Sequence, residues 1–166
     1  MPDRFSDHVS PDDAHTELPL DPDTPSRAPH LRPMALIWVF VGGIVGTGLR
    51  YWFEELWPTG SAQWPWATFL INLSGAFVLG ALLEGLALAG SDDGWRQRIR
   101  LLFGTGLCGA FTTYSTFALE VSLLGRDGAV LMAIAYALIS VVLGMVMAWA
   151  GIAVAGRALR RLGKVA

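Results

Sequence analysis

The sequence predicts an all-α integral membrane protein of four transmembrane helices, the third of which is broken near Gly109. Three observations support this fold. Hydrophobic residues make up 53% of the 166 residues and charged residues only 16%, whereas soluble domains carry about 25% charged residues. Four apolar stretches each reach the ~20 residues that a spanning helix needs. A run of glycine, threonine and serine interrupts the third stretch, and these residues disfavour a continuous helix.

Residues 1–33 precede the first apolar stretch and read as a disordered tail rich in proline and aspartate. The segment holds seven prolines and few large apolar residues. Such a composition cannot bury enough surface to offset the entropy of ordering the chain. All three histidines, His8, His15 and His30, fall in this tail, and we expect no metal site there.

The apolar stretches predict a four-helix transmembrane domain over residues 34–156, followed by a basic C-terminal tail, 157–166. The expected spans are 34–57, 66–90, 99–124 and 128–156. In hydrocarbon only helices and closed barrels satisfy all their backbone groups internally, and unbroken apolar runs of this length are helices. Glycines in the first two spans permit close approach between helices.

Arginine and lysine are distributed unevenly between the two sides of the predicted spans. They lie in the N-terminal tail, the second connection and the C-terminus: Arg27, Arg32, Arg96, Arg98, Arg100, Arg157, Arg160, Arg161 and Lys164. The first connection has none, and the third has only Arg126. The positive-inside rule therefore predicts a multi-pass membrane protein with both termini in the cytoplasm.

Composition and charge also argue against several functions. The net charge of −2 provides no basic stripe for a nucleic acid. The single cysteine, Cys108, lies in an apolar run and is most simply a small packing residue. No nucleophile and base stand in a catalytic arrangement, so we do not expect an enzyme.

Polar side chains inside spans are costly and are therefore candidates for function. Arg50 follows the glycines of the first span, and Asn72 lies well inside the second. The simpler interpretations are that Arg50 extends to the outer interface and that Asn72 joins two helices. Glu84 lies near the inner end of its span, where an interfacial position is the simpler explanation.

The third span carries the densest polar sequence. Gly104, Gly106 and Gly109 are followed by Thr112-Thr113-Tyr114-Ser115-Thr116. A break near Gly109 would free backbone carbonyls at membrane depth, where they are tolerated only if protein buries them or an ion occupies them. Carbonyl oxygens are hard ligands that suit a cation such as Na⁺.

Helical spacing beyond the break places Thr112, Thr116 and Glu120 on one stripe. Tyr114 and Phe117 share a neighbouring face, and the positive edges of their rings can partly solvate an anion.

Ser115, Thr116 and the amide of Asn72 can donate hydrogen bonds to the same anion. The alternative is a helix-packing seam of serine and threonine with two core aromatic residues, and this segment alone does not decide between them.

Three ordered motifs resemble the Fluc (CrcB-type) fluoride channel family. They are Gly42-Gly43-x-x-Gly46-x-x-x-Arg50-Tyr51, then Asn72-Leu73-Ser74-Gly75 with Gly80, and the run from Gly106 to Phe117. The match extends from about residue 42 through the fourth span. The third motif is the most specific of the three.

The resemblance implies a passive, fluoride-selective exporter that lowers cytoplasmic fluoride toxicity. Members of that family are antiparallel dimers of four-helix subunits in the lipid bilayer, with two fluoride pores and a structural Na⁺ at the centre. The residues that it implies for the pore are Asn72, Tyr114, Ser115, Thr116, Phe117, Glu120 and Tyr136. Arg50 matches a basic residue near the vestibule, and the backbone carbonyls of Gly109 and Thr112 match the Na⁺ ligands.

Two features depart from the family pattern. Tyr114 stands where phenylalanine is usual, which adds a hydroxyl to the pore aromatic pair. The strong charge bias also conflicts with a homodimer, whose chains must insert in both orientations. We therefore expect a dimer with a paralogous subunit of opposite topology, while pairing of the chain with itself stays open.

Two other functions compete with a fluoride channel. A small four-helix proton-coupled drug or cation exporter would need a membrane-embedded acid early in the first span, and residues 34–49 contain no carboxylate. A membrane assembly factor without transport would leave the glycine break and the hydroxyl-rich run unexplained.

Overall fold

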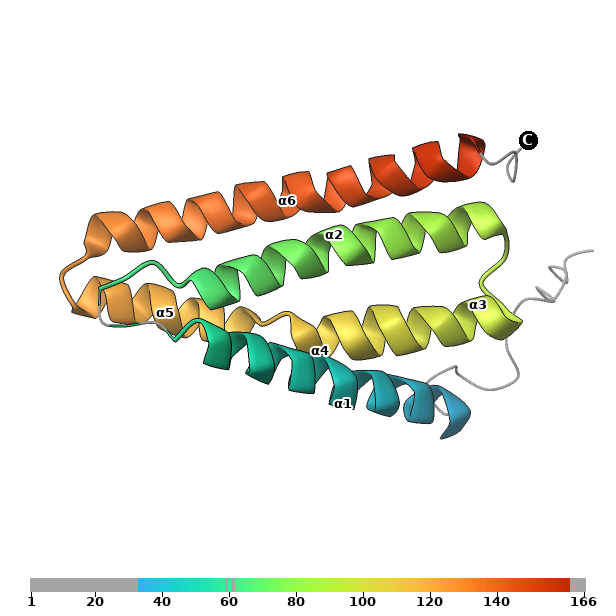
Figure 1. The fold of residues 1–166 in the computed structure, drawn as a ribbon, viewed down its shortest axis with the longest axis horizontal. Helices are drawn as coiled ribbons and strands as arrows, with labels where there is room; N and C mark the ends of the chain where they lie inside the picture. The colour runs from blue at the N-terminus through green and yellow to red at the C-terminus, as the bar shows by residue number, and fades with distance from the viewer. Residues whose placement is uncertain (1–32, 59, 61, 162–166) are drawn as a thin grey trace, which may run out of the picture.

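The computed structural model describes residues 33–58, 60 and 62–161, and every regular element in these residues is helical (Figure 1). The elements are α1 (Pro33–Leu56), α2 (Trp66–Ala89), α3 (Gly94–Ile99), the π-helix η3 (Arg100–Cys108), α4 (Gly109–Phe111), α5 (Tyr114–Arg126) and α6 (Val130–Arg161). Four helical segments are long and apolar enough to cross a membrane, with α3, η3, α4 and α5 together forming the third. The predicted four spans are confirmed.

The predicted N-terminal tail lies almost wholly outside the described residues. Its last residue, Pro33, is the first residue of α1, where proline is favourable because an N-terminal helical residue needs no hydrogen-bond donor. The last residues of the predicted C-terminal tail, 162–166, also lie outside the description. Helix α6 continues past residue 156 to Arg161.

α2 lies beside α6 along most of its length (Figure 1). Two glycines permit this close approach. A Cβ on Gly80 would collide with the carbonyl of Ala148, and a Cβ on Gly151 would collide with the carbonyl of Phe77. Close backbone packing of this kind replaces the hydrophobic driving force that is absent between helices in lipid.

α1 packs against the third span through a second pair of glycines. A Cβ on Gly42 would collide with the carbonyl of Leu102, and one on Gly46 would collide with the carbonyl of Leu107. Gly43 and Gly48 face open space instead. The α1 stripe at positions 42, 46 and 50 is therefore the one that faces η3 and α4.

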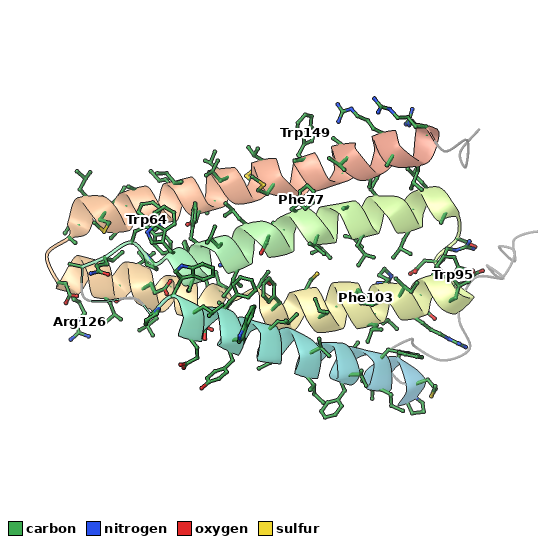
Figure 2. The ribbon with its side chains drawn as sticks, in the orientation of Figure 1. Trp64, Phe77, Trp95, Phe103, Arg126 and Trp149 are labelled. Atoms are coloured by element: carbon green, nitrogen blue, oxygen red, sulfur yellow. The ribbon has the colours of Figure 1, made fainter. Side chains whose placement is uncertain are left out.

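A small buried core lies near the end of the bundle that holds the α1–α2 connection. It consists of Phe69, Leu73, Leu124, Ala133 and Tyr136. Most other large apolar side chains of the spans are exposed on the isolated chain, as expected for surfaces that meet lipid or another subunit. Trp64 and Arg126 mark this end, and Trp95 marks the opposite one (Figure 2).

The third span is interrupted later than predicted. Gly109 keeps right-handed helical torsions (φ −64°, ψ −33°), whereas Thr112 (φ −76°, ψ 154°) and Thr113 (φ −143°, ψ 123°) are extended. The physical reason is that β-branched threonine favours an extended backbone, and the Asn72 side chain of α2 stabilises the extended conformation of Thr113. The glycines Gly104 and Gly106 instead lie in the nine-residue π-helix before the break, an uncommon structure that is frequent at functional sites.

Candidate functional site

The break in the third span is held by the side chain of Asn72 on α2. Its Nδ2 donates to the carbonyl of Thr113 (3.0 Å), and its Oδ1 accepts from the backbone N–H of Thr113 (2.8 Å). Thr113 is only 6% exposed. Unpaired backbone groups at this depth would each cost several kcal/mol in hydrocarbon, so one amide satisfies both backbone groups of Thr113.

Thr113 also begins the next helix. Its Oγ1 accepts from the backbone N–H of Thr116 (3.2 Å), which is an N-cap of α5. The same hydroxyl donates to Thr116 Oγ1 (3.1 Å) and lies 3.3 Å from Ser115 Oγ. An N-cap supplies an acceptor for an otherwise unpaired first-turn N–H, so the break and the restart of the helix use one residue.

A groove of about 400 Å³ opens beside the break, between α2, the third span and α6. The side chains of Asn72, Tyr114 and Phe117 line it, together with Ser140 of α6. Tyr114 is 81% exposed, and its ring lies 6.2 Å from that of Phe117. The groove therefore combines ring edges with amide and hydroxyl groups, which together can surround a small anion.

Glu120 of α5 is the only carboxylate of the described residues with hydrogen bonds from two other helices. Thr68 Oγ1 of α2 donates to its Oε1 (2.7 Å), and the Tyr136 hydroxyl of α6 donates to its Oε2 (2.8 Å). Thr68 is 1% and Tyr136 0% exposed. The two hydrogen bonds hold the Glu120 carboxyl group in one position between α2, α5 and α6.

A second groove, of about 490 Å³, runs beside this carboxylate and is lined by Thr116 and Glu120 among others. The rings of Phe117 and Tyr136 are tilted by 50° with their centroids 5.2 Å apart, and they lie between the two grooves. Phe117 belongs to the first groove and Tyr136 bonds the carboxylate of the second. The two grooves thus lie on either side of one aromatic pair.

Arg50 lies on the α1 stripe that faces the third span, one turn beyond Gly46. Further along the same helix, the ring of Phe53 meets that of Phe111 edge-on at 5.9 Å. Arg50 is half-buried, and no ion pair to it occurs within the described residues. A half-buried cation beside the break can attract an anion.

The structure brings some of the predicted site residues together and separates others. Asn72, Tyr114 and Phe117 share the first groove, and Thr116 and Glu120 share the second. The predicted stripe of Thr112, Thr116 and Glu120 is wrong, because Thr112 is extended and lies in the break, outside α5. Its hydroxyl donates to the Cys108 carbonyl (2.9 Å) instead.

Two other predicted residues have environments that differ from a simple pore lining. Tyr136 is fully buried in the isolated chain, between α5 and the Trp64 ring at 5.4 Å. Ser115 is exposed on α5. One N–H of the Asn72 amide donates to the Thr113 carbonyl, so only the second N–H can donate to an anion in the groove.

Three residues of the site were missed from the sequence. Thr68 precedes Asn72 by four positions on α2, so helical spacing could have placed both on one face. Thr113 belongs to the predicted hydroxyl-rich segment from Thr112 to Thr116, but its role as the N-cap of α5 follows only from the backbone geometry. Ser140 stands four residues after Tyr136, and its buried hydroxyl has no hydrogen-bond partner within the described residues.

Comparison with known proteins finds similar sequences in one family. Residues 37–152 match the family described as "CrcB-like protein, Camphor Resistance (CrcB)". A relative from Cutibacterium acnes, named fluoride-specific ion channel FluC 1, is 47% identical over 122 residues, which cover 74% of this chain and 85% of the relative. The fluoride-specific ion channel FluC 2 of Leifsonia xyli subsp. xyli is 45% identical over 75% and 85% of the two chains. The fluoride-specific ion channel FluC of Ignicoccus hospitalis is 38% identical over a region that covers 76% of this chain and 98% of the relative.

Proposed function

This chain belongs to the CrcB-like protein family, and we propose that it is a fluoride-specific ion channel through which fluoride leaves the cell passively. The structural observation that carries the proposal is the interrupted third span. Asn72 holds an extended segment at membrane depth, next to a groove that Tyr114 and Phe117 line. The names of the relatives state fluoride specificity.

The groove offers groups that can replace the water around fluoride. The edges of the Tyr114 and Phe117 rings carry partial positive charge. The second N–H of Asn72 and the partnerless hydroxyl of Ser140 can donate hydrogen bonds. Selectivity in narrow pores comes from several such groups acting on a partly dehydrated ion.

The driving force needs no nucleotide and no coupled ion. Fluoride enters acidified cells as neutral hydrofluoric acid and dissociates in the more alkaline cytoplasm, where the anion is trapped. A negative-inside membrane potential then supplies about 2.3 kcal/mol per charge per 100 mV. A passive pore is therefore sufficient to lower cytoplasmic fluoride, and no catalytic chemistry is involved.

The proposed working unit is an antiparallel dimer in the lipid bilayer. Both grooves are open on the surface of the single chain, and Tyr114 is 81% exposed, so a second subunit would complete the pathway. The positive-inside bias orients this chain with both termini in the cytoplasm. We therefore expect the partner to be a paralogous subunit of opposite bias, with self-pairing as the alternative.

A structural Na⁺ at the dimer centre fits the carbonyls beside the break. The helical partner of the Gly109 carbonyl would be the N–H of Thr113, but that N–H donates to Asn72. Thr112 is extended, so its carbonyl also lies outside a helix. Two such carbonyls from each subunit would supply four hard oxygen ligands, which suit Na⁺. The bound ion would neutralise carbonyl dipoles that meet at the interface.

The competing proton-coupled exporter is less consistent with the structure. The two carboxylates of α1, Glu54 and Glu55, lie in the last turn of that helix. Glu120 already accepts two hydrogen bonds from buried hydroxyls, which stabilise its charged form in place and leave less capacity for exchange of a cationic substrate.

Fluoride efflux from liposomes tests the proposal. The purified chain is reconstituted alone and together with an oppositely biased paralogue from the same genome, and a fluoride electrode records release beside a chloride control. We expect rapid fluoride release without chloride release from the pair. Equal activity of the chain alone would overturn the heterodimer, and no fluoride release from either sample would overturn the channel.

A further inference from the structure

A groove of about 400 Å³ lies at the turn between α2 and α3, far from the break. Its walls are apolar and include Leu83 and Leu86 of α2, and its rim carries Asp92, Arg96 and Arg100. Both spans end at this turn. Trp95, beside the groove, is 58% exposed, and tryptophan prefers the interface between hydrocarbon and water. The groove therefore lies at the depth of lipid headgroups.

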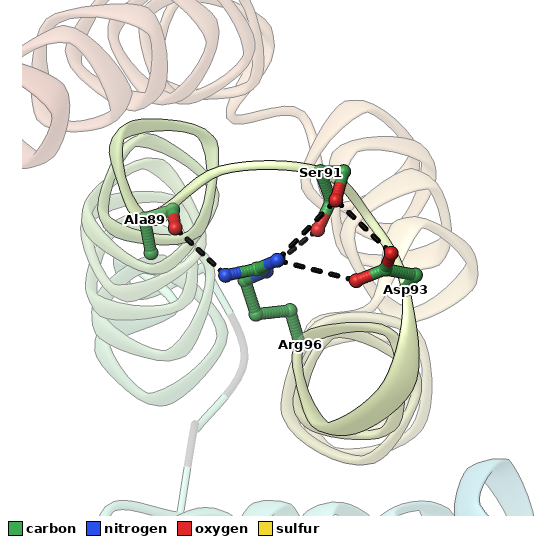
Figure 3. A network of polar contacts seen from close by, with 4 residues as sticks. All are labelled: Ala89, Ser91, Asp93 and Arg96. Carbon is green, nitrogen blue, oxygen red and sulfur yellow. Dashed lines mark hydrogen bonds and ion pairs between the residues drawn. The ribbon is translucent and has the colours of Figure 1, made fainter.

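Arg96 uses four of its five N–H donors in shaping the turn (Figure 3). Its Nε donates to the Ser91 carbonyl (2.6 Å) and its Nη1 to the Ala89 carbonyl (2.7 Å). Its Nη2 reaches the Ser91 hydroxyl (3.3 Å) and an oxygen of Asp93 (3.2 Å). With these acceptors in place, Arg96 makes the rim rigid and has little capacity for a ligand.

Arg100 differs from Arg96 in having a buried guanidinium nitrogen without a partner in the described structure. Its Nη2 forms an ion pair with Asp92, but its Nε is buried without a hydrogen-bond partner in the described structure. A buried donor without an acceptor is unfavourable. An anion in the groove would supply that acceptor after a small rotation of the side chain, and the guanidinium fork suits two oxygens of one phosphate.

This end of the chain is rich in positive charge. Six arginines occupy it: Arg96, Arg98, Arg100, Arg157, Arg160 and Arg161. The acidic residues of the turn are Asp92 and Asp93, so cations exceed anions at this end. Basic grooves between transmembrane helices on the cytoplasmic side are suited to anionic lipid headgroups.

We propose that this groove binds an anionic glycerophospholipid. The phosphate of the headgroup pairs with Arg100, and an acyl chain lies along Leu83 and Leu86. The combination of leucine walls with one partly free guanidinium favours a lipid over a soluble anion, because a soluble phosphate would gain nothing from the apolar wall. The site is separate from the fluoride groove, and it does not depend on the proposed function.

Native mass spectrometry of the detergent-purified protein tests the site. Phosphatidylglycerol, phosphatidylcholine of equal chain length, and inorganic phosphate are added separately. Unmodified protein should retain phosphatidylglycerol about fivefold more than phosphatidylcholine, since one arginine near a membrane surface contributes about that factor. Equal retention of the two lipids would overturn the proposal, and so would equal retention of inorganic phosphate.

The matched variants are Arg100→Gln and Arg98→Gln, which remove the same charge two positions apart on one helical segment. Arg98 is exposed and does not line the groove. Arg100→Gln should abolish the preference for phosphatidylglycerol, while Arg98→Gln should keep it. Equal losses in both would show a general charge effect and contradict a site. Arg100→Lys keeps the charge but lacks the guanidinium fork, so it should retain only part of the preference. It also controls for misfolding of the glutamine variant.

Discussion

Substitution of Asn72 by leucine tests whether this residue holds the break open. Leucine has a similar volume, so the change removes two hydrogen bonds without leaving a large cavity. The backbone N–H and carbonyl of Thr113 would both lose their partners, in a residue that is 6% exposed. The third span would then be free to rearrange around Thr112 and Thr113, and the groove beside Tyr114 would change shape.

The structure gives a magnitude for this change. Each buried polar group without a partner costs about 1–3 kcal/mol, so the two groups of Thr113 should lower the free energy of unfolding by about 2–6 kcal/mol. Hydrogen bonds between membrane helices average only ~0.6 kcal/mol, because the groups find other partners. Two such bonds give a lower limit of about 1 kcal/mol, and we expect Asn72→Leu to lower the free energy of unfolding by about 2 kcal/mol.

The assay is reversible unfolding in mixed detergent micelles, together with fluoride efflux from liposomes. Ser74→Ala is the matched control, because Ser74 is an exposed polar residue of the same helix and its hydroxyl bonds only carbonyls of that helix. Asn72→Leu should lower both stability and efflux, and Ser74→Ala should lower neither. If Asn72→Leu abolished efflux but unfolded like Ser74→Ala, the role of Asn72 in holding the break would be refuted.

Four further substitutions give distinct outcomes. Gly42→Ala should lower the free energy of unfolding by about 1–3 kcal/mol, because a Cβ at this position meets the backbone of η3. Gly43 faces open space, so Gly43→Ala should be neutral or slightly stabilising in the same unfolding assay. Tyr136→Phe removes one of the two hydroxyls that donate to Glu120. It should lower the free energy of unfolding by about 2 kcal/mol and reduce efflux. An unchanged free energy of unfolding would contradict a stabilising role for this hydrogen bond. Tyr114→Phe should leave stability unchanged and keep fluoride efflux, because the ring edge remains; loss of efflux would make the hydroxyl essential.

The sequence was sufficient for the four spans because lipid imposes a simple requirement. A helix that crosses hydrocarbon needs about twenty apolar residues, and the predicted ends of 34–57 and 66–90 differ from α1 and α2 by one residue at most. Helix α6 runs past its predicted end because the arginines after residue 156 can continue a helix outside the apolar region. Helix length beyond the membrane carries no hydropathy signal.

The details of the third span could not be read from local sequence. Glycine content predicted a break near Gly109, and the break lies a few residues further on, where Asn72 from another helix satisfies the backbone of Thr113. The two residues are 41 positions apart, and no local pattern contains that contact. The π-helix and the pairing of Glu120 with Thr68 and Tyr136 depend in the same way on packing between helices.

The most direct test of the account is the dependence of fluoride flux on voltage and on pH. Liposomes that contain the chain with an oppositely biased paralogue are loaded with fluoride, and a potassium gradient with valinomycin sets the membrane potential. The account predicts that fluoride efflux follows the potential, is unchanged by a pH gradient, and is not accompanied by chloride. Efflux that requires a pH gradient, or equal release of chloride, would contradict a passive fluoride-specific channel.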